Sequence, residues 1–312
     1  MKKLLYELIS QFETITIFGH VNPDGDCYGS QIGLRDSLKL SFPNKRIYAL
    51  GSGLPSFFNQ LGQMDDIEDD VINSSLAIVL DVADGPRIED QRYQLATTIF
   101  KVDHHIPDYN FGHHAWVNTD VAATSLLVCE FIQDFKLKLS PVAASALALG
   151  IISDTGRFLF GNLNRDTFQA MSFLMDQGAN LRMLYDAMYK KDINDLQFEK
   201  FVFENYQTTP NGVIYCVFSK DNLQKLNLNE VESSTRVNLL ANFAQYPIWA
   251  FFAEGSSITR AEFRSSGLNV QKIAFAYGGG GHTQASGASL KYFSDIPKII
   301  NELDQLILKG NK

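Results

Sequence analysis

Cysteine is scarce in this sequence and is not arranged to build a scaffold. Only Cys27, Cys129 and Cys216 occur in 312 residues, and no two of them form a Cys-x-x-Cys pair. This number and spacing exclude a disulfide-stapled fold and give no sign of a zinc knuckle. We therefore expect reduced thiols in a chain stabilised by a hydrophobic core, for which 45% of apolar residues is ample.

Long apolar runs are also missing. No stretch reaches about 18 continuous apolar residues, so no membrane span is expected. The opening MKKLLYELISQF places Glu7 within its apolar stretch, lacks a small-residue cleavage site after it, and repeats Leu4, Leu8 and Ile9 at helical spacing. We interpret it as an amphipathic helix rather than a signal peptide, and we expect a cytoplasmic protein.

Positive charge is in short supply too. The chain carries 27 basic and 35 acidic residues, which gives a net charge of −8. Tight binding of long nucleic acid needs many basic contacts to phosphates, so this composition disfavours it. A nucleic-acid ligand would have to be short and held locally.

Short apolar runs alternate with helical stretches through the first part of the chain. Strands are expected at 15–19, 46–50, 76–81 and 98–103, and helices at 29–40 and 146–156. This alternation predicts an α/β domain with a mostly parallel sheet covered by helices. Farther along, the runs 211–219, 246–254 and 257–265 include a hairpin signal at Gly255-Ser256. They predict a smaller C-terminal α/β domain with a mixed sheet.

Asp and His residues gather at the ends of the predicted strands. They stand in GHVNPDGDCYGS (19–30), LDVADG (80–85), VDHH (102–105) and ISDTG (152–156). Ligands collect at the carboxyl ends of parallel strands. Singly, Asp24, Asp81 and Asp154 could each be a turn or helix-cap residue. Together with the adjacent histidines and the H-x3-D-x-D spacing, they indicate a metal site.

The residue types also suggest the kind of metal. Carboxylates and neutral imidazoles bind first-row metals, and four clustered carboxylates would repel one another unless cations balanced them. Two divalent ions would do so and could hold an activated hydroxide against a phosphoryl group. The mixture of histidine and carboxylate favours Mn²⁺, with Mg²⁺, Co²⁺ or Fe²⁺ as substitutes.

These motifs resemble those of the DHH phosphoesterase family, named for the tripeptide that is Asp103-His104-His105 here. The later FRSSG and YGGGGHTQASG resemble the family's associated C-terminal domain, so the resemblance covers nearly the whole chain. Within the family, the short two-domain form is most similar to the bacterial nano-RNases. Those enzymes cleave short oligoribonucleotides (nanoRNA) to mononucleotides and also remove the 3′-phosphate of 3′-phosphoadenosine 5′-phosphate (pAp), which gives AMP.

The resemblance implies two metal positions that share one carboxylate. Their ligands would be His20, Asp24 and Asp81 for one ion, and Asp26, Asp81, His104 and Asp154 for the other. It further implies that His105 lies beside the scissile phosphate and gives a proton or hydrogen bond to the leaving oxygen. Asp103 would be an acid that orients a histidine ligand.

The glycine run Gly278–Gly281 suggests where substrate is held. Glycine lets backbone N–H groups approach an anion closely, and the guanidinium of Arg264 matches a phosphate. Each feature alone could be a flexible loop or a surface salt bridge. With the resemblance, the expected substrate-binding residues are Arg264, Ser265, Gly279, Gly280, Gly281 and His282. Arg260 is a further candidate if no bulge separates its face of the strand from that of Arg264.

The expected organisation has three parts. Residues 1–189 would form the catalytic domain, 190–205 a helical linker and 206–312 the substrate-binding domain, with the active site in the cleft between the domains. The expected ligands are short single-stranded RNA or DNA oligonucleotides, pAp and linear dinucleotides. The sequence leaves open whether the chain forms a homodimer, and in which direction it attacks.

Other functions compete with this hypothesis. One is a phosphodiesterase for cyclic dinucleotides or linear pApA, because the family contains both and the motifs overlap. An inorganic pyrophosphatase would share the metal motifs, but it has no nucleoside for the GGGGH region to hold. A nucleotide-sensing module that does not catalyse would be marked by a missing ligand, and none of the six is missing.

Overall fold

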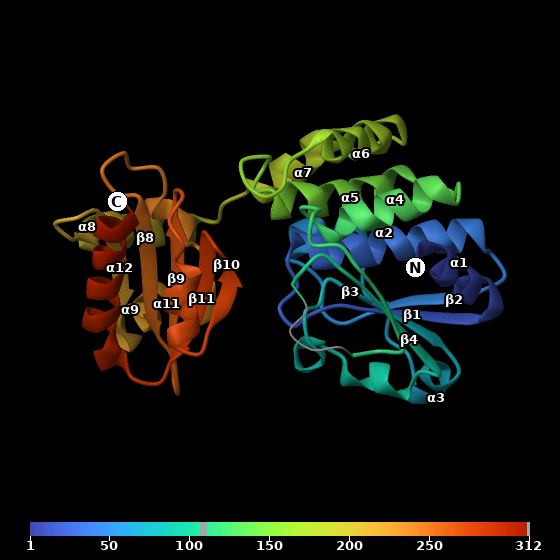
Figure 1. Cartoon of the computed structure of the whole chain (residues 1–312), viewed down its shortest axis with the longest axis horizontal. Coiled ribbons are helices and arrows are strands. Elements are labelled where there is room, and N and C mark those ends of the chain that lie inside the picture. Colours follow the sequence, from blue (N-terminus) through green and yellow to red (C-terminus); the bar gives the residue numbers. More distant parts are fainter. Residues whose placement is uncertain (107–110, 311–312) are drawn as a thin grey trace. The chain divides into compact units, whose positions relative to one another are not determined.

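A computed structural model describes residues 1–106 and 111–310 of the chain. The chain divides into two compact units, Met1–Lys190 and Lys191–Lys312 (Figure 1). Each unit has its own sheet and its own hydrophobic core. The expected α/β class, with a parallel sheet first and a mixed sheet second, is confirmed.

The first unit is built on a parallel five-stranded sheet in the order β2-β1-β3-β4-β5. Its strands are β1 (Thr14–Phe18), β2 (Arg46–Leu50), β3 (Leu76–Leu80), β4 (Thr98–Asp103) and β5 (His114–Val117). Every residue of β1 and β3 is buried. This is the pattern of central parallel strands that are covered on both faces.

Helices cover both faces of this sheet, with α2, α4 and α5 on one side and α3 on the other (Figure 1). The helices of the unit are α1 (Lys2–Gln11), α2 (Gly25–Ser41), α3 (Asp69–Asn73), α4 (Thr124–Asp134), α5 (Pro141–Asp154), α6 (Arg165–Asp176) and α7 (Leu181–Met188). Short 3₁₀ helices are η1 (Ser56–Leu61), η2 (Gly85–Arg87) and η3 (Gln91–Leu95). The opening segment is the expected amphipathic helix, with Leu5 and Ile9 buried. Among the described residues, no helix is long and apolar enough to cross a membrane.

Helices α2 and α5 approach each other closely enough to require glycine. A Cβ on Gly29 would lie 2.3 Å from the carbonyl oxygen of Ala146, and one on Gly150 would lie 2.7 Å from Oδ1 of Asp26. Both helices begin earlier than predicted. The Asp24 side chain caps α2, and Ser140 caps α5. The close packing brings the N-terminus of α2 beside the C-terminus of α5.

The second unit has a six-stranded sheet in the order β10-β11-β9-β8-β7-β6, parallel only between β7 and β8. Its strands are β6 (Gln207–Thr208), β7 (Val213–Phe218), β8 (Ile248–Glu254), β9 (Thr259–Ser265), β10 (Gly280–His282) and β11 (Ala285–Leu290). Its helices are α8 (Ile193–Asn205), α9 (Lys220–Leu226), α10 (Glu230–Ser234), α11 (Gln271–Ala276) and α12 (Ile296–Gly310), with 3₁₀ helices η4 (Val237–Leu240) and η5 (Phe293–Asp295). The predicted β8–β9 hairpin is present.

Helix α8 occupies most of the segment expected to link the domains. Asp192 and Asp195 form a capping box at its start. Phe198 and Val202 are buried in a core cluster together with residues of β7 and β8. The helix therefore packs as part of the second unit, and the division between the units falls at Lys190–Lys191.

Candidate metal centre

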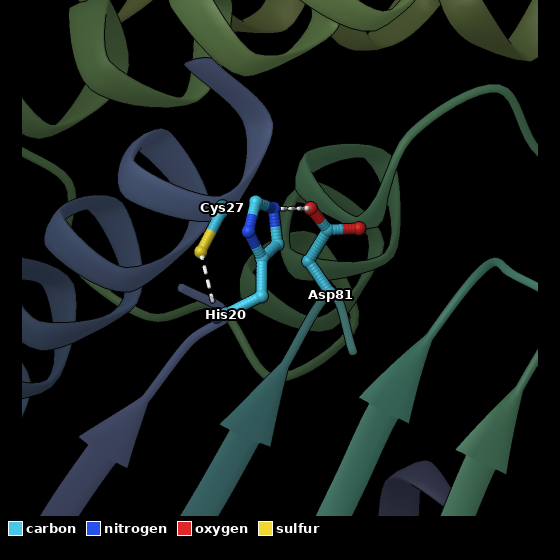
Figure 2. Close-up of side chains that lie close together, drawn as sticks. All are labelled: His20, Cys27 and Asp81. Atoms are coloured by element: carbon cyan, nitrogen blue, oxygen red, sulfur yellow. Dashed lines mark hydrogen bonds and ion pairs between the residues drawn. The ribbon is translucent and has the colours of Figure 1, made fainter. Parts of the chain in front are cut away.

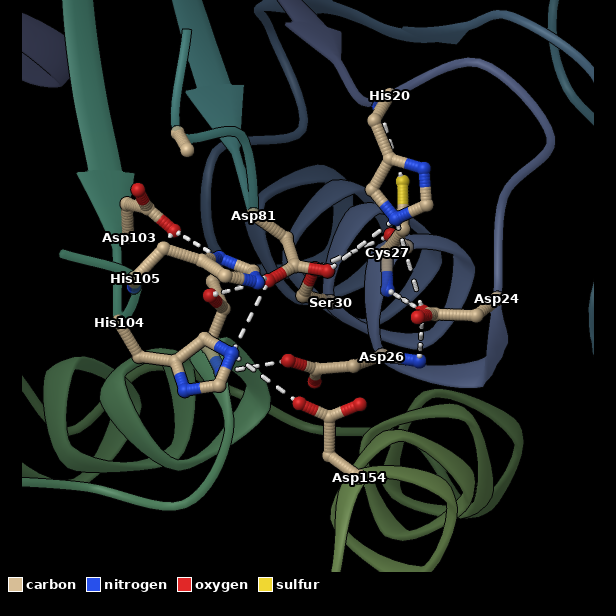
Figure 3. A network of polar contacts seen from close by, with 12 residues as sticks. His20, Asp24, Asp26, Cys27, Ser30, Asp81, Asp103, His104, His105 and Asp154 are labelled. Atoms are coloured by element: carbon tan, nitrogen blue, oxygen red, sulfur yellow. Dashed lines mark hydrogen bonds and ion pairs between the residues drawn. The ribbon is translucent and has the colours of Figure 1, made fainter. Parts of the chain in front are cut away.

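The six predicted metal ligands converge in the first unit. They come from the ends of three neighbouring strands and from the facing ends of α2 and α5 (Figure 3). His20 follows β1, Asp81 follows β3 and His104 follows β4, while Asp24 and Asp26 start α2 and Asp154 ends α5. Parallel strands place their carboxyl ends at one edge, so residues far apart in sequence meet there.

Asp81 lies at the middle of the cluster. Its Oδ2 is 3.6 Å from Nε2 of His20, and its Oδ1 is 3.5 Å from Nε2 of His104. One carboxylate oxygen thus faces His20, and the other faces His104 and also lies 3.6 Å from Nδ1 of His105. Asp81 adopts a left-handed backbone conformation, with φ of 61°, and its N–H donates to the carbonyl of Val102. The hydroxyl of Thr124 also donates to Oδ1, at 3.0 Å.

His20 and Asp24 form one side of the centre. Nε2 of His20 is 3.8 Å from Oδ1 of Asp24, and its Nδ1 lies 2.9 Å from the carbonyl of Val21. Donation from Nδ1 to that carbonyl leaves Nε2 as the nitrogen that can bind a cation. The thiol of Cys27 also belongs here, because its sulfur accepts from the backbone N–H of His20 (Figure 2).

His104 and Asp154 form the other side. Nε2 of His104 is 3.1 Å from Oδ2 of Asp154, and these atoms together with an oxygen of Asp26 lie within 4.8 Å of one another. Nδ1 of His104 faces the carbonyl of Val121 at 3.3 Å. The carboxylate of Asp26 is completely buried. Three potential ligand atoms therefore surround one small volume.

The start of α4 holds Asp26 in place. Its Oδ2 accepts from the backbone N–H of Thr124 at 2.6 Å, and its Oδ1 accepts from that of Ser125 at 2.9 Å. These N–H groups lie in the first turn of the helix, where they have no partner within the helix and the dipole favours an anion. A carboxylate has about four lone-pair positions, so two of these bonds leave capacity for a metal.

The charges of the cluster are unbalanced in the protein alone. Burial, followed by the charges of Asp81 and Asp154, raises the pKa of Asp26 well above its usual range. Burial raises the pKa of Asp154 to about 6. Burial would lower the pKa of His104, but contact with Asp154 and the nearby charges raise it to about 10. Divalent cations would offset these carboxylates, and the donor set is one that such metals accept. The residues therefore fit a metal centre.

Beside this cluster, Asp103 contacts a histidine other than the one expected to bind metal. Its Oδ1 lies 2.8 Å from Nδ1 of His105, whereas Nδ1 of His104 faces a backbone carbonyl. Burial alone would raise the pKa of Asp103, but contact with His105 and the charge of Lys101 lower it to about 2. The histidine that Asp103 contacts is therefore His105.

Three further residues of the centre were not among the predicted ones. Thr124 donates to both Asp26 and Asp81. The sulfur of Cys27 accepts from the backbone N–H of His20, and Nζ of Lys101 lies 3.1 Å from Oδ2 of Asp103. Thr124 lies outside every motif, so no local signal marks it. Lys101 did carry a signal, because it is a charged residue within an apolar strand two positions before an acid.

In the second unit, the sheet aligns Arg264 with His282. Ala285 of β11 pairs with Arg264 on one side and with His282 on the other, so both side chains belong to one cross-strand row. Pairing along β9 is continuous from 259 to 264, and no bulge separates Arg260 from the face of Arg264. Nη1 of Arg264 lies 3.0 Å from Oε2 of Glu262.

Three of the expected substrate residues have structural roles of their own. Ser265 is 2% exposed and its hydroxyl donates to the carbonyl of Leu268. A Cβ on Gly279 would lie 2.0 Å from the carbonyl oxygen of Gly287, and Gly281 has a φ of 122°. The backbone of this sheet edge therefore needs glycine at 279 and 281 whether or not an anion binds there.

The fold brings together acids and histidines that could hold metal ions, and sequence comparison gives the family. Residues 14–151 match the DHH family, N-terminal domain, and residues 211–309 match the DHHA1 domain. The chain belongs to the DHH family of phosphoesterases, which are metal-dependent hydrolases. The resemblance of the sequence motifs is thereby confirmed.

Relatives match over almost the whole chain. The Bacillus subtilis protein named bifunctional oligoribonuclease and PAP phosphatase NrnA is 34% identical and covers 98% of this chain and 98% of its own. A Mycoplasma pneumoniae protein of the same name is 37% identical, over 96% and 94%. The crystal structure of an exopolyphosphatase-related protein from Bacteroides fragilis has the same fold, with a TM-score of 0.86, 22% identity and coverage of 99% and 95%.

Proposed function

We propose that this protein hydrolyses short oligoribonucleotides to mononucleotides and removes the 3′-phosphate of pAp to give AMP. The reaction would take place at a centre with two divalent cations, for which Mn²⁺ is preferred. The observation that carries the proposal is Asp81, whose two carboxylate oxygens face His20 and His104 separately. The names of the full-length relatives support the substrate class.

In this proposal, His20, Asp24 and Asp81 hold one cation, and Asp26, Asp81, His104 and Asp154 hold the other. When bound, the cations would lower the pKa of water and neutralise charge on the phosphoryl group. The water oxygen attacks phosphorus, the bond to the leaving oxygen breaks, and that oxygen takes up a proton. His105 supplies this proton, and Asp103 keeps its ring oriented through Nδ1.

The second unit would hold the part of the substrate that does not react. Arg264 and His282 lie in one row of the sheet and offer donors suited to a phosphate or sugar. Gly280 and Gly281 would add backbone N–H groups. We leave Ser265 and Gly279 out of this set, because the hydroxyl of Ser265 is used by Leu268 and Gly279 packs against β11.

Arg264→Ala is expected to raise KM for pAp and largely spare kcat. A lost charge-assisted hydrogen bond is worth roughly 1.5–3 kcal/mol, which is about ten- to hundred-fold in kcat/KM. Steady-state kinetics on pAp and on bis-p-nitrophenyl phosphate would measure this. The control is Arg236→Ala, which removes an arginine of the second unit that pairs with Asp195 and lies outside the row of Arg264 and His282. Equal losses on the generic ester, or an unchanged KM for pAp, would show that Arg264 does not hold substrate.

A substrate panel tests the proposed function itself. Wild-type protein with Mn²⁺ is offered a dinucleotide, a five-residue RNA, a structured 50-residue RNA, pAp, linear pApA, cyclic di-AMP and pyrophosphate, with Asp81→Ala as the control for contaminating nucleases. We expect turnover of the short RNAs and pAp, and poor turnover of the long RNA. Preferential cleavage of cyclic di-AMP or pApA, hydrolysis of pyrophosphate alone, or nucleotide binding without turnover would contradict the proposal in favour of the corresponding alternative.

A further inference from the structure

Lys101 is a buried lysine that has no role in the proposed reaction as described above. It lies in β4 with 2% exposure, and its Nζ is 3.1 Å from Oδ2 of Asp103. Nζ also donates to the carbonyl of Ala83 at 2.8 Å and lies 4.8 Å from the ring centre of Phe111. Removing an ammonium group from water is costly, so a buried lysine needs a compensating role.

The other oxygen of Asp103 is turned toward His105. Oδ1 accepts from the backbone N–H of His105 at 3.2 Å and lies 2.8 Å from its Nδ1 (Figure 3). Each carboxylate oxygen therefore has a different neighbour, with Lys101 beside Oδ2 and His105 beside Oδ1. Rotation of the carboxylate would disturb the contact with Lys101 and the contact with the imidazole at the same time.

Of these three side chains, only that of His105 is appreciably exposed. The side chain of Lys101 is 2% exposed, that of Asp103 is fully buried and that of His105 is 28% exposed. Lys101 is thus too deep to touch a substrate, whereas His105 is accessible to one. Any effect of Lys101 on the reaction must pass through a neighbouring residue.

We propose that Lys101 is a positioning residue that acts through Asp103 to fix the imidazole of His105 in the orientation from which it reaches the leaving oxygen. This inference rests on the role given to His105 in the proposed function. A group that orients a catalytic imidazole through a buried acid adds to the rate without contacting the substrate. Without Lys101, Oδ2 of Asp103 loses its ion-pair partner, and only the contacts of Oδ1 with His105 remain to fix the carboxylate.

Lys101→Met tests this, because methionine keeps most of the apolar stem and removes the ammonium. We expect kcat for pAp to fall roughly ten- to hundred-fold, with KM nearly unchanged. The adenosine 3′-oxygen needs a proton when it leaves, whereas p-nitrophenolate does not. The loss should therefore shrink on the p-nitrophenyl ester of AMP. In a His105→Ala background, Lys101→Met should lower kcat no further.

Arg35→Met is the matched control. Arg35 is also a buried cation of the first unit, 7% exposed and paired with Asp36 and Asp65. It lies ten residues into α2 from Gly25, about 15 Å along the helix. Arg35→Met should lower thermal stability, as Lys101→Met does. The ratio of kcat on pAp to kcat on the p-nitrophenyl ester should nevertheless stay at the wild-type value in Arg35→Met.

Two results would overturn the inference: equal losses of kcat on both esters, or the same further loss in the His105→Ala background as in the wild type. If Lys101→Met does not fold, Lys101→Gln replaces it, because the amide removes the charge but keeps a polar group beside Oδ2 of Asp103. A fall in kcat on pAp that exceeds the fall on the p-nitrophenyl ester supports the inference, and equal falls overturn it. If the wild type cleaves other phosphoesters but not pAp, the proposed function is wrong, but the role of Lys101 can be tested separately. The kcat of Lys101→Met is then compared between those esters and the p-nitrophenyl ester.

Discussion

Asp81→Ala is expected to lower kcat on pAp and on short RNA by on the order of 10⁴-fold, more than any other single ligand change. The reason is that Asp81 faces both histidines, so its loss would disturb both cation positions. Asp24 and Asp154 each contact only one of these histidines. Steady-state kinetics on each variant, with metal content measured in parallel, would establish the order.

A second substitution separates charge from backbone strain at this position. Asp81 has a φ of 61°, which alanine tolerates less well than asparagine does. Asp81→Asn keeps the shape and the conformation but removes the charge, so we expect it to fold like the wild type and to be as inactive as Asp81→Ala. If Asp81→Ala retained near wild-type kcat while Asp24→Ala did not, the bridging role of Asp81 would be wrong.

Removal of metal is expected to abolish turnover completely, and Mn²⁺ should restore it best. The centre combines imidazoles with carboxylates, and its carboxylates are unbalanced without cations. Chelation, followed by addition of Mn²⁺, Mg²⁺, Co²⁺ or Fe²⁺, measures the recovery of activity. Cations that bind the folded state should also raise Tm, with about 2.7 kcal/mol of stabilisation at 100 times Kd. Full activity of metal-free protein would exclude the two-metal proposal.

Much of the centre could be predicted because most of its acids and histidines directly follow predicted strands. The acids and histidines that follow β1, β3 and β4 stand directly after apolar runs, and parallel topology alone brings such residues together. The family resemblance then supplied what spacing could not, such as the choice of His104 over His105 as a ligand. In the structure His104 faces Asp154, while both His104 and His105 lie near Asp81, so that choice stays a prediction.

What could not be predicted depends on tertiary contacts. Asp26 accepts hydrogen bonds from the first turn of α4, nearly a hundred residues farther along the chain. The sequence around Thr124 contains no motif that would predict these bonds. The partner of Asp103 depends on side-chain orientation after β4, which alternation along a strand does not determine. The family resemblance places Ser265 among the expected substrate residues, whereas in the structure its hydroxyl donates to the carbonyl of Leu268.

The segment expected to link the domains also depends on tertiary contacts. The sequence predicts a helical linker over residues 190–205, and the structure buries two apolar residues of α8, Phe198 and Val202, in a core of the second unit. The helix was predictable from its spacing. Its place in that core was not, because it depends on the residues of β7 and β8 that receive it.

Cation stoichiometry is the most direct test of the central claim that the Asp81 carboxylate joins two metal positions. Metal-free wild type and Asp81→Asn would be titrated with Mn²⁺ and followed by electron paramagnetic resonance, which distinguishes single from coupled ions. We expect the wild type to bind two ions per chain with a magnetically coupled spectrum, and Asp81→Asn to lose the coupling. A single uncoupled ion in the wild type, or an unchanged coupled pair in Asp81→Asn, would contradict the account.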